Sequence, residues 1–561
     1  MHKKAAFLVI LLSALAASVF AQTTYLPLNT EDNYLLDRLE TRSGRLSDSL
    51  FLNMKPVMRN RAVDFLETQK EGARYSGLSH IDRYDIARMI SENGEWTANE
   101  DGAVESKHPW VHTFYQKQFD FIHVHTNNFF LVVNPIISGE LYSESNNKAG
   151  SLYWTARGAE LRGWISKRIG FYTSVTDNQE KEVSFVDTFN RNHIAVPGAD
   201  YYLGRESGKY DYLQASGYVD FSVIKDHMNV DFGYGKNFIG NGLTSMFLSD
   251  FSAAYPYLKI TTRIWKINYQ NLFMELTPTH GNTLDELQPH KYATMHHLSM
   301  NVTKWWNIGL FESIIFDRTN SYEIRYLNPI IFLGSMEQSL GSPDKKHLGF
   351  DTKIILLRHV QLYGQFLLDE FKASQFFGHN GWWGNKWALQ MGAKYFDAFG
   401  IKNFDLQGEL NIVRPYTYTH SDTIANYTNY NQPLANPLGA DFIQFIGVAK
   451  YQPAKRLYLT AKLMYYIQGV DTGASDYGSN IFQSYNNRPQ EYGVTLINGV
   501  KTNCILLNFN AAYELRPNLF LELGATNRSY TYQNGFQPNY TSTYFYGGFR
   551  LNIAKRDWEF Y

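Results

Sequence analysis

Apolar and polar residues alternate along most of the chain, from about Phe129 to the C-terminus. In the segment 404–411, for example, Phe404, Leu406 and Leu410 alternate with acidic and amide residues. Side chains two positions apart share one face of a β-strand, so each such segment predicts a strand with one apolar and one polar face. Carboxylates and arginines on the polar face indicate that this face does not lie in lipid.

Connections of two lengths separate the predicted strands. Short polar turns, such as 167–170 and 516–518, alternate with long polar segments such as 414–442 and 469–500. Outer-membrane barrels keep their turns short on the periplasmic side and their loops long outside. With the N-terminus in the periplasm, the alternation stays in phase to the last residue and predicts about eighteen antiparallel strands, an even number as in single-chain bacterial barrels. Residues 318–347 fit either a strand pair or one loop, and we interpret them as one long outer or infolded loop.

The N-terminal part of the chain lacks this alternation. Residues 1–21 combine a basic start, an apolar run and a Val-Phe-Ala ending, which is typical of a cleaved secretory signal peptide. No cysteine follows the cleavage site, so a lipoprotein anchor is not expected. Residues 27–96 are polar and helical in pattern, and Thr30, Pro56 and Ser79 are predicted helix starts. The predicted organisation is a signal peptide (1–21), a periplasmic helical segment forming a small bundle (22–115) and an outer-membrane β-barrel (116–561).

Composition narrows the class of protein. The net charge is −1, which argues against electrostatic binding of nucleic acid. Tyrosine (40 residues) and phenylalanine (38 residues) are abundant, and after the signal peptide no apolar stretch is long enough for a spanning helix. Aromatic girdles at both interfaces are typical of transmembrane β-barrels, while a soluble secreted β-protein is the alternative. The single cysteine, Cys504, is predicted to be a small apolar strand residue.

Motifs for nucleotides, catalysis and metals are weak. The stretch FGYGKNFIGNGLTSMFLSD (232–250) lacks the glycine spacing of a P-loop or a dinucleotide fingerprint, and no serine lies in a Gly-x-Ser-x-Gly setting. His123 and His125 would share a strand face and could chelate a metal, but no carboxylate at ligand spacing completes the site. We therefore predict a protein that is not an enzyme, with no cofactor and no metal; a barrel hydrolase is the weakest alternative.

Two groups of residues are candidates for function. Charged side chains on the predicted inward face form either ion pairs that hold a wide barrel in shape or a ligand-selective lining; they are Glu160, Arg162, Asp220, Asp231, Glu275 and Glu409. Aromatic side chains in the predicted outer loops suit sugar rings with apolar C–H faces, and an aromatic girdle with packing inside the loops explains them equally well. The candidates for polysaccharide binding are Trp382, Trp383, Arg414, Tyr416, Tyr418, Tyr427 and Tyr430.

Several stretches resemble a known family. They include RGAELRGWI (157–165), GKNFIGNGLTSMFLSDFSAAYPYLKI (235–260), RPYTYTH (414–420) and NPLGADF (436–442). These stretches resemble the capsule-assembly Wzi family of outer-membrane proteins, and in particular its gliding-motility RemB-like group of Bacteroidetes. The resemblance implies an eighteen-stranded barrel with a periplasmic helical bundle, associated with surface attachment of capsular polysaccharide or exopolysaccharide.

The sequence thus predicts a multi-pass β-barrel of the bacterial outer membrane that binds or anchors capsular or extracellular polysaccharide, with a link to gliding motility. The expected partners are outer-membrane lipid, the polysaccharide, and export or motility proteins in the periplasm or at the surface, and no nucleic acid. A solute-specific, porin-like channel is the alternative. The sequence does not identify the polysaccharide, nor does it tell whether the N-terminal helices plug the barrel or bind a partner.

Overall fold

The computed structural model describes residues 23–556, with gaps at 72–76, 99–100, 108, 112, 146, 148–149, 203, 207, 279–287, 319–320, 331, 342–343, 371, 379 and 474. The predicted signal peptide and the C-terminal Tyr561 lie outside the described residues.

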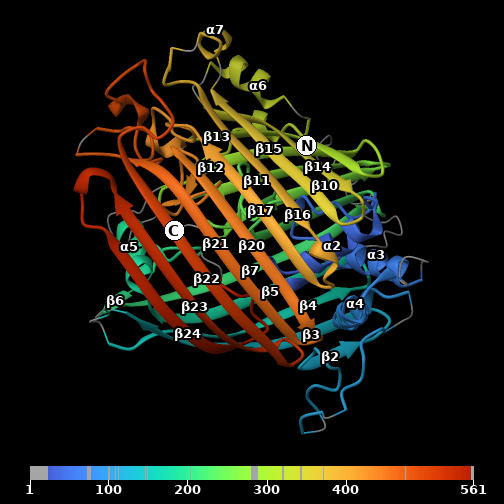
Figure 1. Ribbon diagram of the computed structural model, residues 1–561. Helices are drawn as coiled ribbons and strands as arrows, with labels where there is room; N and C mark the ends of the chain where they lie inside the picture. The colour runs from blue at the N-terminus through green and yellow to red at the C-terminus, as the bar shows by residue number, and fades with distance from the viewer. Residues whose placement is uncertain are drawn as a thin grey trace.

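Eighteen antiparallel strands within the described part of the chain close into a barrel (Figure 1). The first strand of the wall, β3 (Phe129–Glu144), pairs with the last, β24 (Tyr540–Leu551), so that Ile137 lies opposite Leu551. Closure leaves no free edge in the wall, as a membrane requires of a β-structure. The prediction of a closed antiparallel barrel of about eighteen strands is confirmed.

The remaining strands of the wall follow the chain order. They are β4 (Leu152–Ile165), β5 (Ile169–Lys181), β7 (Lys209–Ile224), β8 (Met228–Gly235), β10 (Tyr255–Ile264), β11 (Ile267–Leu276), β12 (Lys291–Asn301), β13 (Trp306–Phe316), β14 (Lys345–Leu356), β15 (Val360–Glu370), β16 (Lys386–Tyr395), β17 (Phe404–Val413), β20 (Phe442–Ala454), β21 (Leu457–Val470), β22 (Val500–Arg516) and β23 (Leu519–Tyr532). Short strands add to this ring or pair elsewhere: β1 (Met54–Lys55), β2 (Ile122–His125), β6 (Gly204–Glu206), β9 (Phe238–Ile239), β18 (Thr428–Asn429) and β19 (Gln432–Pro433).

The outward face of the wall is apolar and is therefore the lipid face. On β23 and β24, Leu523 and Phe545 are 70% and 63% exposed, while the alternating Thr526 and Tyr544 are buried on the lumen side. An outward apolar band and a polar interior are typical of outer-membrane barrels. The protein is thus an outer-membrane β-barrel, with the short-turn rim in the periplasm and the long-loop rim outside. No helix in the described part of the chain has both the length and the apolar character needed to cross a membrane.

The N-terminal unit consists of three helices, α2 (Glu31–Ser43), α3 (Arg59–Glu71) and α4 (His80–Glu92). Leu36, Leu66 and Met89, one from each helix, are buried in a shared apolar core. The predicted capping box at α4 is present, because the Ser79 Oγ accepts from the Asp82 amide at 2.9 Å and the Asp82 carboxylate accepts from the Ser79 amide. The prediction that Pro56 opens a helix is wrong: the preceding residues pair as strand β1, and α3 begins at Arg59.

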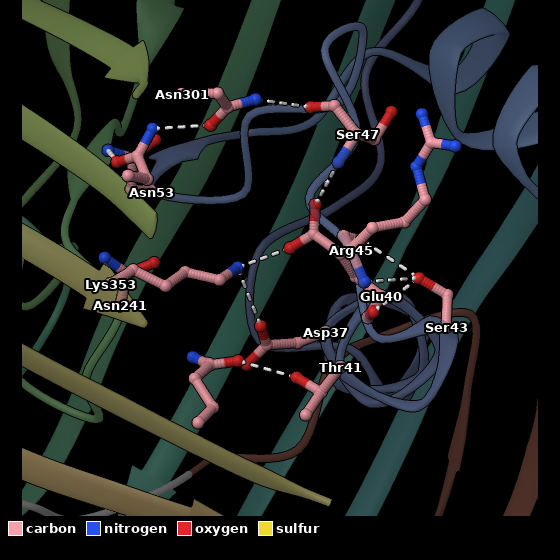
Figure 2. A network of polar contacts seen from close by, with 12 residues as sticks. Asp37, Glu40, Thr41, Ser43, Arg45, Ser47, Asn53, Asn241, Asn301 and Lys353 are labelled. Atoms are coloured by element: carbon pink, nitrogen blue, oxygen red, sulfur yellow. Dashed lines mark hydrogen bonds and ion pairs between the residues drawn. The ribbon is translucent and has the colours of Figure 1, made fainter. Parts of the chain in front are cut away.

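This helical unit closes the periplasmic end of the lumen. Helix α2 contacts inward side chains of the wall on β14 to β17, and Figure 2 shows part of that contact, in which Lys353 of β14 binds Asp37 and Glu40 of α2. Strand β1 of the unit pairs with β9, which belongs to the outer loop after β8, so that Met54 lies opposite Ile239. The unit therefore plugs the barrel and meets an infolded outer loop inside the lumen.

The loop between β13 and β14 lies against the outside of the wall. Ile315 of β13 faces the core inside the barrel, so its neighbours Ile314 and Phe316 face outward. These two pack with Tyr326 and with Leu333 of helix α6 (Leu333–Leu340). In its described residues, the predicted segment 318–347 is thus one outer loop that carries a helix and ends at the start of β14, and this loop lies outside the lumen and forms no strand pair.

Candidate functional site

Three of the six predicted inward charges bind chain segments that fill the lumen. Arg162 pairs with Glu95 of the helical unit, Asp220 accepts a hydrogen bond from the Thr23 amide at 3.1 Å, and Glu409 accepts from the Thr244 amide of an outer loop at 3.2 Å. Two others contact the wall itself. They are Asp231, which pairs with Lys259 at 2.9 Å, and Glu160, which accepts from Asn134 at 3.2 Å. These charges therefore anchor the plugs and brace the wall.

Glu275 does not face the lumen, which corrects the prediction from the sequence. On β11 the neighbours Met274 and Leu276 are buried in the apolar core inside the barrel, so Glu275 lies on the opposite face. Its carboxylate pairs with His290 at 3.1 Å, and its side chain is 41% exposed. The expectation that charged side chains face the lumen fails here because an apolar outer loop, not water, fills the lumen at this height.

Two outer loops close the extracellular end of the lumen. Residues 236–254 and 414–441 bury Phe247, Tyr418 and Tyr427 in one apolar core with inward side chains of the wall. The Tyr418 hydroxyl donates to the Met246 carbonyl at 2.9 Å, and the Tyr427 hydroxyl donates to the Phe247 carbonyl at 2.6 Å. The two loops therefore pack on each other as a second plug.

The predicted polysaccharide candidates divide into buried and accessible groups. Tyr416, Tyr418 and Tyr427 are at most 1% exposed, so their rings pack within the loops and offer no face to a ligand outside. Burial raises the pKa of the Tyr416 hydroxyl well above its ordinary value, and that hydroxyl donates to the Asp476 carbonyl at 2.8 Å. Trp383 is also buried, at 8% exposed, whereas Trp382, Arg414 and Tyr430 are partly exposed. For the three buried tyrosines, packing inside the loops is the better explanation.

An aromatic and basic cluster lies near the outer rim where the loop before β16 meets the loop between β21 and β22; Trp383 and Lys386 are buried, and the other three side chains are partly exposed. Trp383 lies 4.7 Å from Tyr485 between ring centroids and 5.9 Å from Trp382. The Arg488 guanidinium lies 4.1 Å from the centre of the Trp383 ring, and the Lys386 ammonium lies 4.1 Å from the centre of the Tyr485 ring. Cations over aromatic faces hold these rings in fixed positions. We call these five residues the outer aromatic cluster.

Sequence reasoning found Trp382 and Trp383 but missed the residues that complete the cluster. Tyr485 and Arg488 belong to the long loop between β21 and β22, more than a hundred residues away along the chain. The Trp383 amide donates to the Glu491 carbonyl at 3.1 Å, which joins the two loops. The nearby chain supplies exposed Asn486, Asn487 and Tyr492. The only signal in the sequence was the amide-rich and aromatic composition of this loop.

A cavity of about 470 Å³ remains inside the lumen, between the helical unit, the infolded loop after β8 and strands β20 to β24. Its basic lining side chains outnumber the acidic ones. The basic ones are Lys55, Lys236, Lys394, Lys450, Lys462, Arg550, Lys555 and Arg556, and the acidic ones are Glu31, Asp37, Asp250 and Glu522. Burial lowers the pKa of Lys236 to about 8. The space between the two plugs thus carries positive charge.

Comparison with known proteins gives a likeness of fold. No protein-family model matches the chain, and no curated protein sequence matches it. Among solved structures, the chain resembles Wzi of Escherichia coli, which is described as an outer-membrane protein involved in group 1 capsule assembly and as a carbohydrate-binding β-barrel. The TM-score is 0.56 and the identity 11%, over 95% of this chain and 100% of Wzi. The fold implied by the resemblance to the Wzi family is therefore confirmed.

Two further solved structures are more distant. OprD of Pseudomonas aeruginosa has a TM-score of 0.41 and 10% identity, over 75% of this chain and 95% of OprD. OccAB2 of Acinetobacter baumannii has a TM-score of 0.41 and 8% identity, over 75% of this chain and 98% of OccAB2.

Proposed function

We propose that this protein is a non-catalytic outer-membrane barrel that binds capsular or extracellular polysaccharide at the cell surface through the outer aromatic cluster. The observation that carries the proposal is the meeting of two outer loops in one ordered aromatic and basic cluster at the mouth of a plugged barrel, with Trp382, Tyr485 and Arg488 partly exposed. Sugar rings present apolar C–H faces to flat aromatic side chains. Guanidinium groups bind carboxylates in a bidentate manner; the Arg488 guanidinium pairs with Glu491 of the same loop, so an acidic sugar would exchange with that carboxylate.

The filling of the lumen from both ends supports binding over transport. The helical unit contacts the wall from the periplasmic side, and the loops 236–254 and 414–441 contact it from outside. A solute-specific channel would have to move at least one of these plugs. The likeness to a carbohydrate-binding barrel of the same architecture also supports binding over transport. A link to gliding motility, and to export or motility proteins, extends the proposal and predicts defective colony spreading in a deletion strain.

The test compares retention of the organism's own capsular or extracellular polysaccharide by cells that carry the wild-type chain, a deletion, or a Trp382→Ala/Tyr485→Ala variant. We expect the variant to assemble and to lose retention as the deletion does. Trp110→Ala is the matched control, because Trp110 is an exposed tryptophan (60%) of the N-terminal segment and should leave retention unchanged. Normal retention in the variant and in the deletion would contradict the proposal, and conductance in planar bilayers would then test the channel.

A further inference from the structure

The segment between the helical unit and the wall brings together three potential metal ligands. Strand β2, near the base of the barrel in Figure 1, pairs with the start of β3. His123 and His125 lie two positions apart on β2 and therefore project from the same face. The sequence offered no carboxylate at ligand spacing, but the fold places Asp101, from the loop after α4, beside both imidazoles.

The distances suit a single transition-metal ion. The Asp101 Oδ2 atom lies 3.4 Å from the His123 Nε2 atom and 4.0 Å from the His125 Nδ1 atom, and the three ligand atoms all lie within 4.8 Å of one another. Zinc–ligand bonds of about 2.0–2.2 Å place neighbouring atoms of a tetrahedral site about 3.4 Å apart. The Asp101–His123 contact already has this length, the Asp101–His125 contact lies about half an ångström beyond it, and the two imidazole nitrogens, which lie within 4.8 Å of each other, also have to come to this separation.

His123 is already oriented as a metal ligand. Its Nδ1 atom lies 2.7 Å from the Asp120 carboxylate, and Asp120 in turn lies 3.5 Å from the Arg162 guanidinium. A carboxylate that accepts from Nδ1–H fixes the tautomer in which Nε2 carries the lone pair. The His123 side chain is 9% exposed, and its buried Nε2 atom has no hydrogen-bond partner in the described part of the chain. A buried acceptor without a partner is costly unless something binds it.

When no metal is bound, the Lys117 ammonium is the cation beside Asp101. Its ammonium lies 3.0 Å from the same Asp101 oxygen, 2.8 Å from Glu105 and 3.1 Å from the Ala103 carbonyl. The ammonium could therefore stay with Glu105 and the Ala103 carbonyl after it left Asp101. Lys117 thus competes with a metal for one ligand and does not block the site.

We propose that Asp101, His123 and His125 form a zinc site that fastens the 97–121 segment to strand β2. Two imidazoles and one carboxylate are donors that Zn²⁺ prefers, and a three-ligand site leaves a fourth position for water. The side chains of Asp101 and His125 are 25% and 18% exposed, so this position is open to solvent on the periplasmic side. The metal links the helical plug to the wall at the point where the chain enters the barrel.

Zinc titration of the full-length barrel in detergent micelles tests the site. After treatment with a chelator, the wild type should bind one equivalent of Zn²⁺ at pH 7.5 in a calorimetric titration. Affinity should fall at least tenfold in His123→Ala, His125→Ala and Asp101→Asn. His290→Ala is the matched control, because His290 contacts a single carboxylate, Glu275, at 3.1 Å, and this variant should bind zinc as the wild type does. Unchanged affinity in the ligand variants, or no binding by the wild type, would overturn the proposal.

Two further measurements do not depend on the folding of the ligand variants. Lys117→Met removes the competing ammonium and should tighten zinc binding about threefold or more; unchanged affinity would show that the metal does not use Asp101. Co²⁺ in the wild-type site should give the intense visible absorption of a tetrahedral centre, and a weak octahedral spectrum would contradict the three-ligand geometry. Neither result bears on polysaccharide retention, so the zinc site and the proposed function are tested independently.

Discussion

At the periplasmic end of the lumen, charged side chains of the helical unit meet charged side chains of the wall, whereas at the outer end apolar rings and uncharged hydroxyls of two loops meet the same wall. Arg38 of α2 binds Asp397 and Asp405, and Lys394 binds Asp37. At the other end, the Phe247 ring stacks on Phe311 of the wall, with centroids 4.5 Å apart. The two plugs touch where β1 pairs with β9.

Ion pairs and apolar packing stabilise a plug in different ways. Buried ion pairs contribute little beyond their own desolvation cost, but breaking one leaves an unpaired charge and is strongly destabilising. Apolar packing depends little on pH and is strengthened, not screened, by salting-out ions. The helical unit is therefore the plug whose own charged side chains a change in charge can unpair, whereas the outer loops hold to the wall through apolar packing and through backbone amides that donate to wall carboxylates such as Glu409 and Asp369.

The largest expected effect is the loss of Arg38. Its side chain is 4% exposed and contacts Asp82, Asp397 and Asp405. Arg38→Ala leaves Asp82 and Asp405 buried without their cation, while Asp397 keeps Arg42 at 3.3 Å, and should cost about 3–5 kcal/mol. Amide hydrogen exchange in α2 should accelerate accordingly, while exchange in residues 243–248 should stay slow.

The control for this variant is an arginine of the same unit in an exposed pair. Arg61 lies 2.7 Å from Asp226, whose side chain is 48% exposed. Exposed pairs contribute about 0–1 kcal/mol, so Arg61→Ala should leave exchange in α2 almost unchanged. Equal effects of the two variants would show that burial of the charges does not control the plug.

Acid should weaken the contact between helix α2 and the wall. Burial raises the pKa of Asp37, but the ammonium groups of Lys394 and Lys353 offset this, so that its pKa lies below the ordinary value of 3.8. A carboxyl group with a lowered pKa contributes stability that is full above its unfolded-state pKa and is lost as the pH falls through its folded-state pKa. Protection of α2 should therefore fall by about 2 kcal/mol as the pH drops below about 4.

The variant Asp37→Asn isolates this effect. It should be less protected than the wild type at neutral pH and should show a flatter acid profile. Glu40→Gln should keep the acid dependence, because burial outweighs Lys353 and raises the pKa of Glu40, which gives the opposite sign. An acid profile unchanged by Asp37→Asn would assign the loss to another group.

At the outer end, the steric fit of apolar rings against the wall holds the loop. Gly349 of β14 lies against the Phe247 ring, and a Cβ atom at this position would lie 2.4 Å from the ring carbon Cε1. Gly349→Ala should therefore displace the ring and cost about 1–3 kcal/mol. Exchange in residues 243–248 should accelerate at every pH, with α2 unaffected. Acceleration confined to α2 would mean that the outer loop does not depend on this contact.

The sequence predicted the wall far better than the plugs. Alternation is a local property, so strands such as β17 and the capping box at Ser79 and Asp82 could be found from neighbouring residues. The burial of Tyr418 and Tyr427 depends on a loop almost two hundred residues away, which no local pattern encodes. Glu275 was misplaced for the same reason, since only the infolded loop makes the lumen apolar beside it.

The candidate sites show the same limit. Trp382 and Trp383 were conspicuous in a polar loop, but their partners Tyr485 and Arg488 come from a different connection of the barrel. At the proposed zinc site, His123 and His125 were visible because a strand repeats every two residues. Asp101 was not, because its position depends on how the loop after α4 folds back.

The smallest expected effect distinguishes the two ends most cleanly. The hydroxyls of Tyr418 and Tyr427 each donate to a buried carbonyl of the other loop, at 2.9 and 2.6 Å. Tyr418→Phe or Tyr427→Phe keeps the ring and leaves that carbonyl without its donor, which should cost about 1–2 kcal/mol. The exposed Tyr492→Phe is the control and should cost almost nothing, since its side chain is 52% exposed.

The double variant tells whether the outer plug acts as one unit. The two rings stack with centroids 5.4 Å apart, and residues in contact usually couple, so the two costs should not add. Because burial raises the pKa of both hydroxyls well above 10.0, they stay protonated, and the costs measured by exchange should be the same at pH 5 and pH 8. A cost that changed between these values would mean that a group titrating between pH 5 and pH 8 also holds the outer loops, and the contrast between an inner plug held by its own charged side chains and an outer plug held by rings and hydroxyls would fail.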